Sequence, residues 1–289
     1  MRKPLFTGIC TALVTPFMHE HVNYPLAEQL LRRQIDAGIG AVVLAGTTGE
    51  SSTLTDSEKI ELFRRGKQFA DKQCLIIAGT GSNSTAHAVE LSKEAEAAGA
   101  DALLIVSPYY NKATDDGLYA HYLSIAHAVS IPIILYNVPS RTGVDIPVSV
   151  YKRLSSVPNI CGVKEASTDI RKIINIRQDC PEDFCVWTGN DHMIVPSVSL
   201  GCQGAISVLS NVLPIETKSL CDAAIAGSYS SAAKLQCKLM PIIDLMFCEV
   251  NPIPVKAAMR LVGYDCGDCR LPLTSLSKEN TRRMESFFQ

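Results

Sequence analysis

The stretch Ala98-Gly99-Ala100-Asp101-Ala102-Leu103-Leu104-Ile105-Val106-Ser107 contains the junction that decides the fold. Upstream of it, Ala88, Leu91 and Ala95 follow the spacing of a buried helical face, which ends at Gly99. Glycine often ends a helix because, without a Cβ atom, it adopts the left-handed conformation at little cost. An apolar run starts only a few residues later. The stretch therefore predicts a helix, a short loop and a buried strand.

The same junction occurs at Ala37-Gly38 before Ala41 and at Leu200-Gly201 before Ala205. Apolar runs with helix-like segments between them recur along the first 210 residues or so. The eight runs begin near Thr7, Ala41, Leu75, Ala102, Ile131, Ile160, Phe184 and Gln203. Alternating strands and helices indicate parallel β/α units, and eight of them are the number that a (β/α)8 TIM barrel requires.

The C-terminal quarter shows a different pattern. After the eighth run there are only helix-like pieces, at residues 215–227, 229–248, 252–261 and 275–289. We therefore predict a catalytic barrel over residues 1–224 and a small helical extension over residues 225–289. No linker rich in Gly, Ser or Pro separates the two, so the extension is expected to pack on the barrel.

Composition narrows the class of function. The chain has 289 residues, 47% of them apolar and 19% charged, with a net charge of −2. Such a composition indicates a globular protein that acts on small molecules, without the basic excess that nucleic acid or an anionic membrane would require. No apolar segment reaches the roughly 18 to 20 residues of a membrane span, and no signal-peptide core follows Met1. We expect a cytoplasmic protein.

Cysteines and glycines give two patterns of low specificity. The cysteine count of eleven is odd, and we expect reduced thiols. Cys266-Gly-Asp-Cys269 has the spacing of half a zinc site, but a second pair is missing, so a loop with two unlinked thiols is preferred. Gly79-Thr-Gly81-Ser-Asn-Ser84 begins like a dinucleotide fingerprint, but serine replaces its third glycine. We expect no metal and no cofactor.

One lysine stands at the end of the sixth apolar run, Ile160–Ser167. Strand alternation places Lys164 on the same face as Gly162 and Ala166, whose small size leaves room around the amine. A lysine shielded from water loses its proton more easily and can attack a carbonyl to form a Schiff base. For this stretch alone, a lysine that reaches outward into solvent is the commoner case.

Polar residues also follow three other predicted strands, at the barrel end where active sites lie. Gly46-Thr-Thr-Gly-Glu50 offers hydroxyls and amides for a carboxylate, and Arg141 could bind one bidentately. Tyr110 and Tyr136 carry phenols that can relay protons. Taken singly, such tyrosines are more often packing aromatics and such an arginine a surface residue, and the loop alone could be a plain polar turn.

Together the motifs resemble a known family. They are GTTGES (46–51), AGTGSN (78–83), SPYYNK (107–112), GLYAHY (117–122), YNVPSRTG (136–143), GVKEAS (162–167) and NPIPVK (251–256). Seven motifs in this order resemble the class I pyruvate aldolases and lyases of the N-acetylneuraminate lyase superfamily. Within it, the chain is similar to the branch that condenses pyruvate with L-aspartate 4-semialdehyde, the first committed step of diaminopimelate and lysine biosynthesis.

The resemblance implies roles for individual residues. Lys164 would form the Schiff base with pyruvate, and Thr48 would hold the pyruvate carboxylate with the backbone of its loop. Tyr136 would move protons to and from the adduct. Thr47 would connect Tyr136 to Tyr110 in a proton relay.

The resemblance also implies an oligomer and a second subsite. In the family, the tyrosine at the position of Tyr110 comes from the neighbouring subunit, which implies a homodimer, and dimers commonly pair into tetramers. Arg141 would guide the carboxylate of aspartate semialdehyde. Gly189 and Ile206 would line the pocket.

Two other functions are compatible with parts of the pattern. Lyases of N-acetylneuraminate or of 2-keto-3-deoxy sugar acids share the lysine, the loop at residues 46–50 (the threonine loop) and the first tyrosine. They generally lack an arginine at the position of Arg141. A non-catalytic barrel that binds keto acids is disfavoured because Lys164, Tyr136, Tyr110 and Thr47 occur together.

One set of residues departs from the family pattern. Lysine-inhibited members carry two histidines after the threonine loop and a glutamate on the next helix, which hold the inhibitor. Asp56, Lys59 and His87 occupy these positions here, although Ser51, Asn83 and Tyr109 are kept. Loss of a carboxylate and gain of an ammonium disfavour a dibasic ligand, so we predict weak or absent feedback by lysine.

Overall fold

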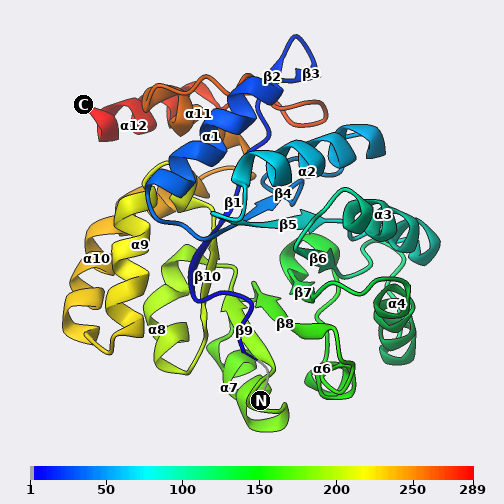
Figure 1. Cartoon of the computed structure of the whole chain (residues 1–289). Coiled ribbons are helices and arrows are strands. Elements are labelled where there is room, and N and C mark those ends of the chain that lie inside the picture. The colour runs from blue at the N-terminus through cyan, green and yellow to red at the C-terminus, as the bar shows by residue number, and fades with distance from the viewer. Residues whose placement is uncertain (1–2) are drawn as a thin grey trace.

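The computed structural model describes residues 3–289, in which eight parallel strands close into a barrel surrounded by helices (Figure 1). The predicted TIM barrel is confirmed. Each strand coincides with one of the expected apolar runs. The strands are β1 (Gly8–Ala12), β4 (Ala41–Leu44), β5 (Leu75–Gly79), β6 (Ala102–Val106), β7 (Ile133–Asn137), β8 (Ile160–Glu165), β9 (Cys185–Thr188) and β10 (Gly204–Ser207). The ring closes between β1 and β10.

Helices follow the strands along the chain. They are α1 (Tyr24–Asp36), α2 (Asp56–Ala70), α3 (Thr85–Ala97), α4 (Asp115–Ala128), α5 (Pro139–Thr142), α6 (Val148–Leu154), α7 (Ile170–Asp179), α8 (Ile194–Ser199) and α9 (Pro214–Ile225), with short 3-10 turns η1 (Asp191–Met193) and η2 (Leu209–Asn211). At the start of α2, the Thr55 hydroxyl accepts from the Glu58 amide and the Glu58 carboxylate accepts from the Thr55 amide. This reciprocal capping box fixes where α2 begins.

Glycines end the helices at the predicted junctions. Gly38, Gly99 and Gly201 have φ angles of 75°, 91° and 88°, in the left-handed region. A side chain would be strained there, so glycine is needed at each turn into the next strand. By contrast, the hairpin of β2 (Phe17–Met18) and β3 (His21–Val22) was not predicted. Strands of two residues are too short to produce a recognisable alternation.

The C-terminal extension consists of α10 (Tyr229–Met246), α11 (Ile253–Leu261) and α12 (Lys278–Phe288), close to the predicted helical pieces. In Figure 1, α10 runs beside α9, and the two helices contact each other. Buried Leu220 of α9, Ile243 of α10 and Met259 of α11 belong to one hydrophobic cluster with the helix-facing side of the barrel. The division of the chain after residue 224 stays a prediction.

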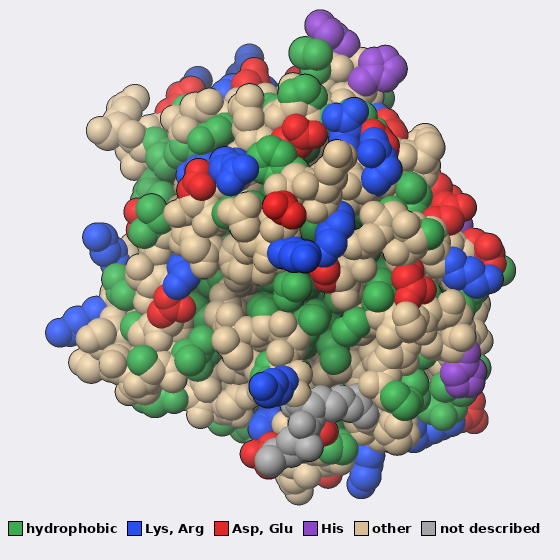
Figure 2. Space-filling view, viewed as in Figure 1, with side chains coloured by type: hydrophobic (Ala, Val, Ile, Leu, Met, Phe, Trp, Pro, Cys, Tyr) green, Lys and Arg blue, Asp and Glu red, His purple; other side chains and the backbone are tan. Residues whose placement is uncertain are grey.

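A second, smaller cluster fills the interior of the barrel. It includes Ala41, Val43, Tyr136, Trp187 and Ile206, which alternate along their strands with residues that face the helices. Acidic and basic side chains are interspersed on the face shown in Figure 2, as expected from the small net charge. In the described residues, no helix is both long and apolar enough to cross a membrane.

Candidate active site

Lys164 lies on β8 and faces the barrel interior. The strand register places it beside Tyr136 on β7 and Trp187 on β9, both members of the interior cluster. Its side chain is buried, with 5% of the residue exposed. The outward-reaching lysine that the sequence left open is therefore excluded.

The amine of Lys164 has an aromatic neighbour. Its Nζ atom lies 4.4 Å from the centre of the Tyr136 ring. Within residues 3–289 this amine makes no hydrogen bond and no ion pair besides the ring contact. An amine in this position is shielded from water and has its nitrogen available for a carbonyl compound.

The room around Lys164 comes from a glycine that directly follows the next strand, β9. A Cβ atom at Gly189 would lie 2.9 Å from Cε of Lys164 and 2.7 Å from Cβ of Ala166. Gly162, which the sequence pattern also suggested as a source of space, lies instead against the backbone of β9, because a Cβ there would be 2.1 Å from the Cys185 carbonyl oxygen. That part of the prediction is wrong.

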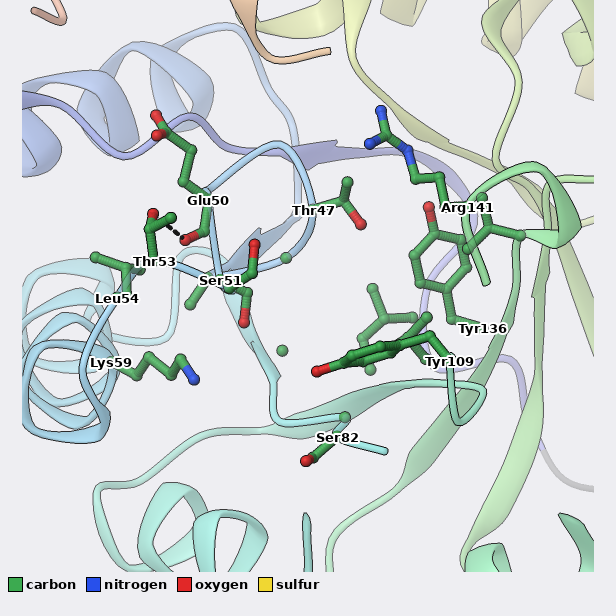
Figure 3. Close-up of a pocket in the computed structure, with 18 of the residues that line it drawn as sticks. Thr47, Glu50, Ser51, Thr53, Leu54, Lys59, Ser82, Tyr109, Tyr136 and Arg141 are labelled. Atoms are coloured by element: carbon green, nitrogen blue, oxygen red, sulfur yellow. Dashed lines mark hydrogen bonds between the residues drawn. The ribbon is translucent and has the colours of Figure 1, made fainter. Parts of the chain in front are cut away.

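A cavity of about 600 Å³ lies at the C-terminal ends of β4 to β7 (Figure 3). Of the predicted site residues, Thr47, Tyr136 and Arg141 line it. Lys164 and Thr48 do not line it and are buried, with exposures of 5% and 2%. Tyr136 connects the two regions, since its ring both lines the cavity and lies over the Lys164 amine.

The threonine loop after β4 is closely folded. The Ser51 amide donates to the Gly46 carbonyl, and the Glu50 amide donates to the Thr47 carbonyl. Glu50 has a φ angle of 56°, which is uncommon for a residue with a side chain and is maintained only where surrounding contacts require it.

The contacts that hold the threonine loop in place come from the C-terminal extension. The Asn251 side-chain amide donates to the Thr48 hydroxyl over 3.0 Å, and Arg141 donates through Nη2 to the Asn251 carbonyl, also over 3.0 Å. Lys256 of α11 forms a buried ion pair with Glu50. Asn251 and Lys256 were quoted only as part of a motif, and no position-specific role was predicted for them. Both residues lie about 200 positions from the loop in the sequence, so their contacts with it could not be predicted.

The other predicted residues lie in different surroundings. Ile206 is fully buried in the barrel interior, and Gly189 is next to Lys164. Tyr110 is 91% exposed with a φ angle of 71°, and it does not line the cavity, whereas the preceding Tyr109 does. One chain therefore does not assemble the complete predicted proton relay.

Two buried carboxyl groups lie near Lys164: Glu165, the last residue of β8, and Asp191, in the η1 turn after β9. Burial raises the pKa of Glu165, although it accepts hydrogen bonds from the Ser167 amide and the Asn137 side chain. Burial likewise raises the pKa of Asp191, while amide hydrogen bonds and the positive charge of Lys164 oppose the shift. Asp191, in the η1 turn after β9, is therefore close enough to Lys164 for the two side chains to interact electrostatically.

The glycines of the apparent nucleotide fingerprint have a packing role. A Cβ at Gly79 would be 2.3 Å from the Ala45 carbonyl oxygen, and one at Gly81 would be 2.4 Å from the Val106 nitrogen. Both glycines therefore permit close approach of neighbouring strands. Cys266 and Cys269 are free thiols, and burial raises the pKa of each to about 12.

Comparison with known proteins agrees with this geometry. Residues 5–289 match the model of the Dihydrodipicolinate synthetase family. The chain belongs to the dihydrodipicolinate synthetase family. A 4-hydroxy-tetrahydrodipicolinate synthase from Acetivibrio thermocellus is 47% identical over 281 residues, which cover 97% of this chain and 95% of the relative.

Solved structures of the family superpose closely on this chain. Dihydrodipicolinate synthase from Aquifex aeolicus does so with a TM-score of 0.96 at 40% identity, over 98% of this chain and 97% of the other. The chloride-inhibited synthase from Acinetobacter baumannii, a complex with pyruvate, gives a TM-score of 0.93 at 40% identity over 97% of each chain. The resemblance seen in the sequence is confirmed.

One wall of the cavity carries the residues that depart from the family pattern. Asp56 contacts both His87, at 2.8 Å, and Lys59, at 3.3 Å, and His87 also contacts the Ser82 hydroxyl at 3.1 Å. Figure 3 shows Lys59 and Ser82 across the cavity from Thr47 and Arg141. Burial raises the pKa of Asp56, but the hydrogen bond with His87 and the charge of Lys59 outweigh it and lower the pKa.

Proposed function

We propose that this chain is a 4-hydroxy-tetrahydrodipicolinate synthase, which condenses pyruvate with L-aspartate 4-semialdehyde in lysine and diaminopimelate biosynthesis. The observation that carries the proposal is the buried Lys164 amine 4.4 Å from the centre of the Tyr136 ring. Family membership over nearly the whole chain supports it. The proposed place of the reaction is the cytoplasm.

In the proposed mechanism, Nζ of Lys164 attacks the keto carbon of pyruvate and water leaves, which gives an imine. Loss of a proton from the methyl carbon then gives an enamine, whose carbon attacks the aldehyde of the second substrate. Tyr136 moves the protons because it is the phenol beside the amine. Thr48 and its loop bind the pyruvate carboxylate, and Arg141 binds the carboxylate of the aldehyde.

The experiment that tests the proposal is borohydride reduction in the presence of pyruvate, followed by peptide mass mapping. The adduct is expected on residue 164, and turnover is expected with aspartate semialdehyde. An adduct with turnover only on sugar acids would favour the alternative lyase. Absence of an adduct would favour a keto-acid-binding barrel.

We also propose that Tyr110 completes the site of a neighbouring subunit in a homotetramer built as a dimer of dimers. Its 91% exposure on a single chain supports this, because a large aromatic side chain so exposed is typical of an interface. Sedimentation would give the oligomeric state. Co-expression of Lys164→Ala and Tyr110→Phe chains should restore part of the activity lost by each alone, since one hybrid site then has both side chains. No restoration would exclude the shared site.

A further inference from the structure

We propose that Asn251 is a positioning residue for the reaction: its side-chain amide fixes the direction in which the Thr48 hydroxyl donates its proton. This inference rests on the proposed function, in which Thr48 binds the carboxylate of pyruvate. It assigns a catalytic contribution to the C-terminal extension, outside the eight β/α units of the barrel.

The first observation is the direction of the hydrogen bond. Asn251 Nδ2 donates to Oγ1 of Thr48 over 3.0 Å, and the two residues are 5% and 2% exposed. In the part of the chain that the structure describes, this is the only hydrogen bond of the Thr48 hydroxyl. Since the amide occupies a lone pair of the oxygen, the hydroxyl proton is left for another acceptor. A carboxylate is such an acceptor.

The second observation is that Asn251 is itself held in place. Its backbone carbonyl accepts from Nη2 of Arg141 over 3.0 Å, and its Nδ2 reaches Thr48. Asn251 therefore contacts both groups that are proposed to bind carboxylates, one through its backbone and one through its side chain.

The third observation is that residues 251–256 are attached to the threonine loop by a second contact. Lys256, five residues after Asn251, pairs with Glu50, two residues after Thr48, with 2.6 Å between Nζ and Oε1. The second carboxylate oxygen of Glu50 accepts from the Arg270 amide over 2.9 Å. The loop and the segment therefore keep a fixed distance, which a hydrogen bond of defined direction requires.

Because Asn251 uses its side chain for Thr48 and its backbone for Arg141, a substitution can change the KM for one substrate and not for the other. A side-chain substitution at Asn251 removes the bond to Thr48 but leaves the backbone carbonyl that Arg141 uses. Asn251→Ala should therefore raise the KM for pyruvate about tenfold, the usual effect of weakening a hydrogen bond to a charged ligand. The KM for aspartate semialdehyde should stay within about twofold of wild type.

Asn251→Asp tests the direction of the bond. A carboxylate accepts from the Thr48 hydroxyl and turns its proton away from the substrate, so the KM for pyruvate should rise at least as much as in Asn251→Ala. If Asn251 instead accepted the hydroxyl proton, Asn251→Asp would preserve the contact and the KM would not rise. Thr48→Val should abolish the effect of Asn251→Ala, because the hydroxyl through which Asn251 acts is gone. An additive effect in the double variant would overturn the proposal.

Two controls separate this inference from the proposed function. Asn159→Ala removes a side-chain amide that donates to the Ala126 and Val129 carbonyls, at the opposite end of β8. It should lower the melting temperature and leave the KM for pyruvate unchanged. Borohydride trapping on Lys164 at saturating pyruvate should persist in Asn251→Ala. Failure of trapping in the wild type would refute the Schiff base, whereas trapping with an unchanged KM in Asn251→Ala would refute only the positioning role.

Discussion

Lys256 and Glu50 form an ion pair with 2.6 Å between Nζ and Oε1, and their side chains are 4% and 1% exposed. The pair connects α11 of the C-terminal extension to the threonine loop after β4. The Nζ atom of Lys256 also lies 4.1 Å from the centre of the Phe17 ring and donates to the Asp268 carbonyl. A charge pair so far from water is stable only while both partners are present.

Lys256→Met should therefore destabilise the protein by about 3 to 5 kcal/mol, because it leaves the Glu50 carboxylate buried without its counter-charge. Denaturant unfolding measures this. The double variant Glu50→Gln with Lys256→Met should recover part of the loss. Lys93→Met, which breaks the exposed pair with Glu90, is the control and should cost less than about 1 kcal/mol. Equal effects of the two lysine substitutions would contradict the prediction.

Tyr136→Phe should reduce kcat by about 10² or more, because it removes the phenol that is proposed to move protons at the Lys164 adduct. Steady-state kinetics and circular dichroism check that turnover falls while the fold stays intact. Tyr122→Phe is a matched control, since the buried Tyr122 hydroxyl has no hydrogen-bond partner among residues 3–289. Its removal should leave kcat unchanged. A normal kcat in Tyr136→Phe would contradict the proton-transfer role proposed for this phenol.

Inhibition by lysine should be weak or absent. Asp56 is engaged by both His87 and Lys59 on the cavity wall, and the ammonium of Lys59 repels a dibasic ligand. A lysine titration of the activity should show no half-effect in the sub-millimolar range.

A triple variant supplies the corresponding gain of function. Asp56→His, Lys59→His and His87→Glu together restore the residue types of lysine-inhibited relatives, so this protein should bind lysine more tightly than the wild type in calorimetry. Sub-millimolar inhibition of the unmodified enzyme would contradict the prediction.

Stability should depend on pH through Glu58. A bidentate contact with Arg270, at 2.5 and 2.8 Å, lowers the pKa of Glu58 from 4.5 to about 2. Because the pKa is lower in the folded state, this contribution is fully present above pH 4.5 and is lost as the pH falls toward 2. The melting temperature of Glu58→Gln should lie below that of the wild type at pH 6, and the gap should narrow as the pH is lowered.

The control for this pH dependence is Glu279→Gln, which changes an exposed residue in the first turn of α12. Its melting temperature should follow that of the wild type at each pH. A gap for Glu58→Gln that stays constant from pH 6 to pH 3 would show that the carboxylate contact with Arg270 does not titrate as expected.

The local features of the barrel could be predicted because each depends on a few neighbouring residues. Glycines such as Gly99 ended helices where a left-handed residue was needed. Strand alternation placed Lys164 on the opposite face from Glu165, but it did not decide whether that face lay inside the barrel. Two-residue strands such as Phe17–Met18 escaped detection because they carry almost no periodic signal.

The surroundings of the lysine were predicted less well. The space beside its side chain was attributed to Gly162 and Ala166, its small neighbours in sequence, but Gly189, just after β9, provides room there and Gly162 does not. Which glycine faces a side chain depends on how adjacent strands are staggered, and a single strand does not contain that information.

The sequence by itself determined the order of strands and helices and membership of a family whose motifs it carries. Only the tertiary structure decided that Asn251 reaches Thr48, 203 residues away, and that Lys256 neutralises Glu50. The physical reason is the sequence separation of the interacting residues. Backbone conformation and side-chain periodicity depend on neighbouring residues and can therefore be seen in the sequence. A polar contact between distant segments arises only when the folded barrel brings them together and removes water from between them.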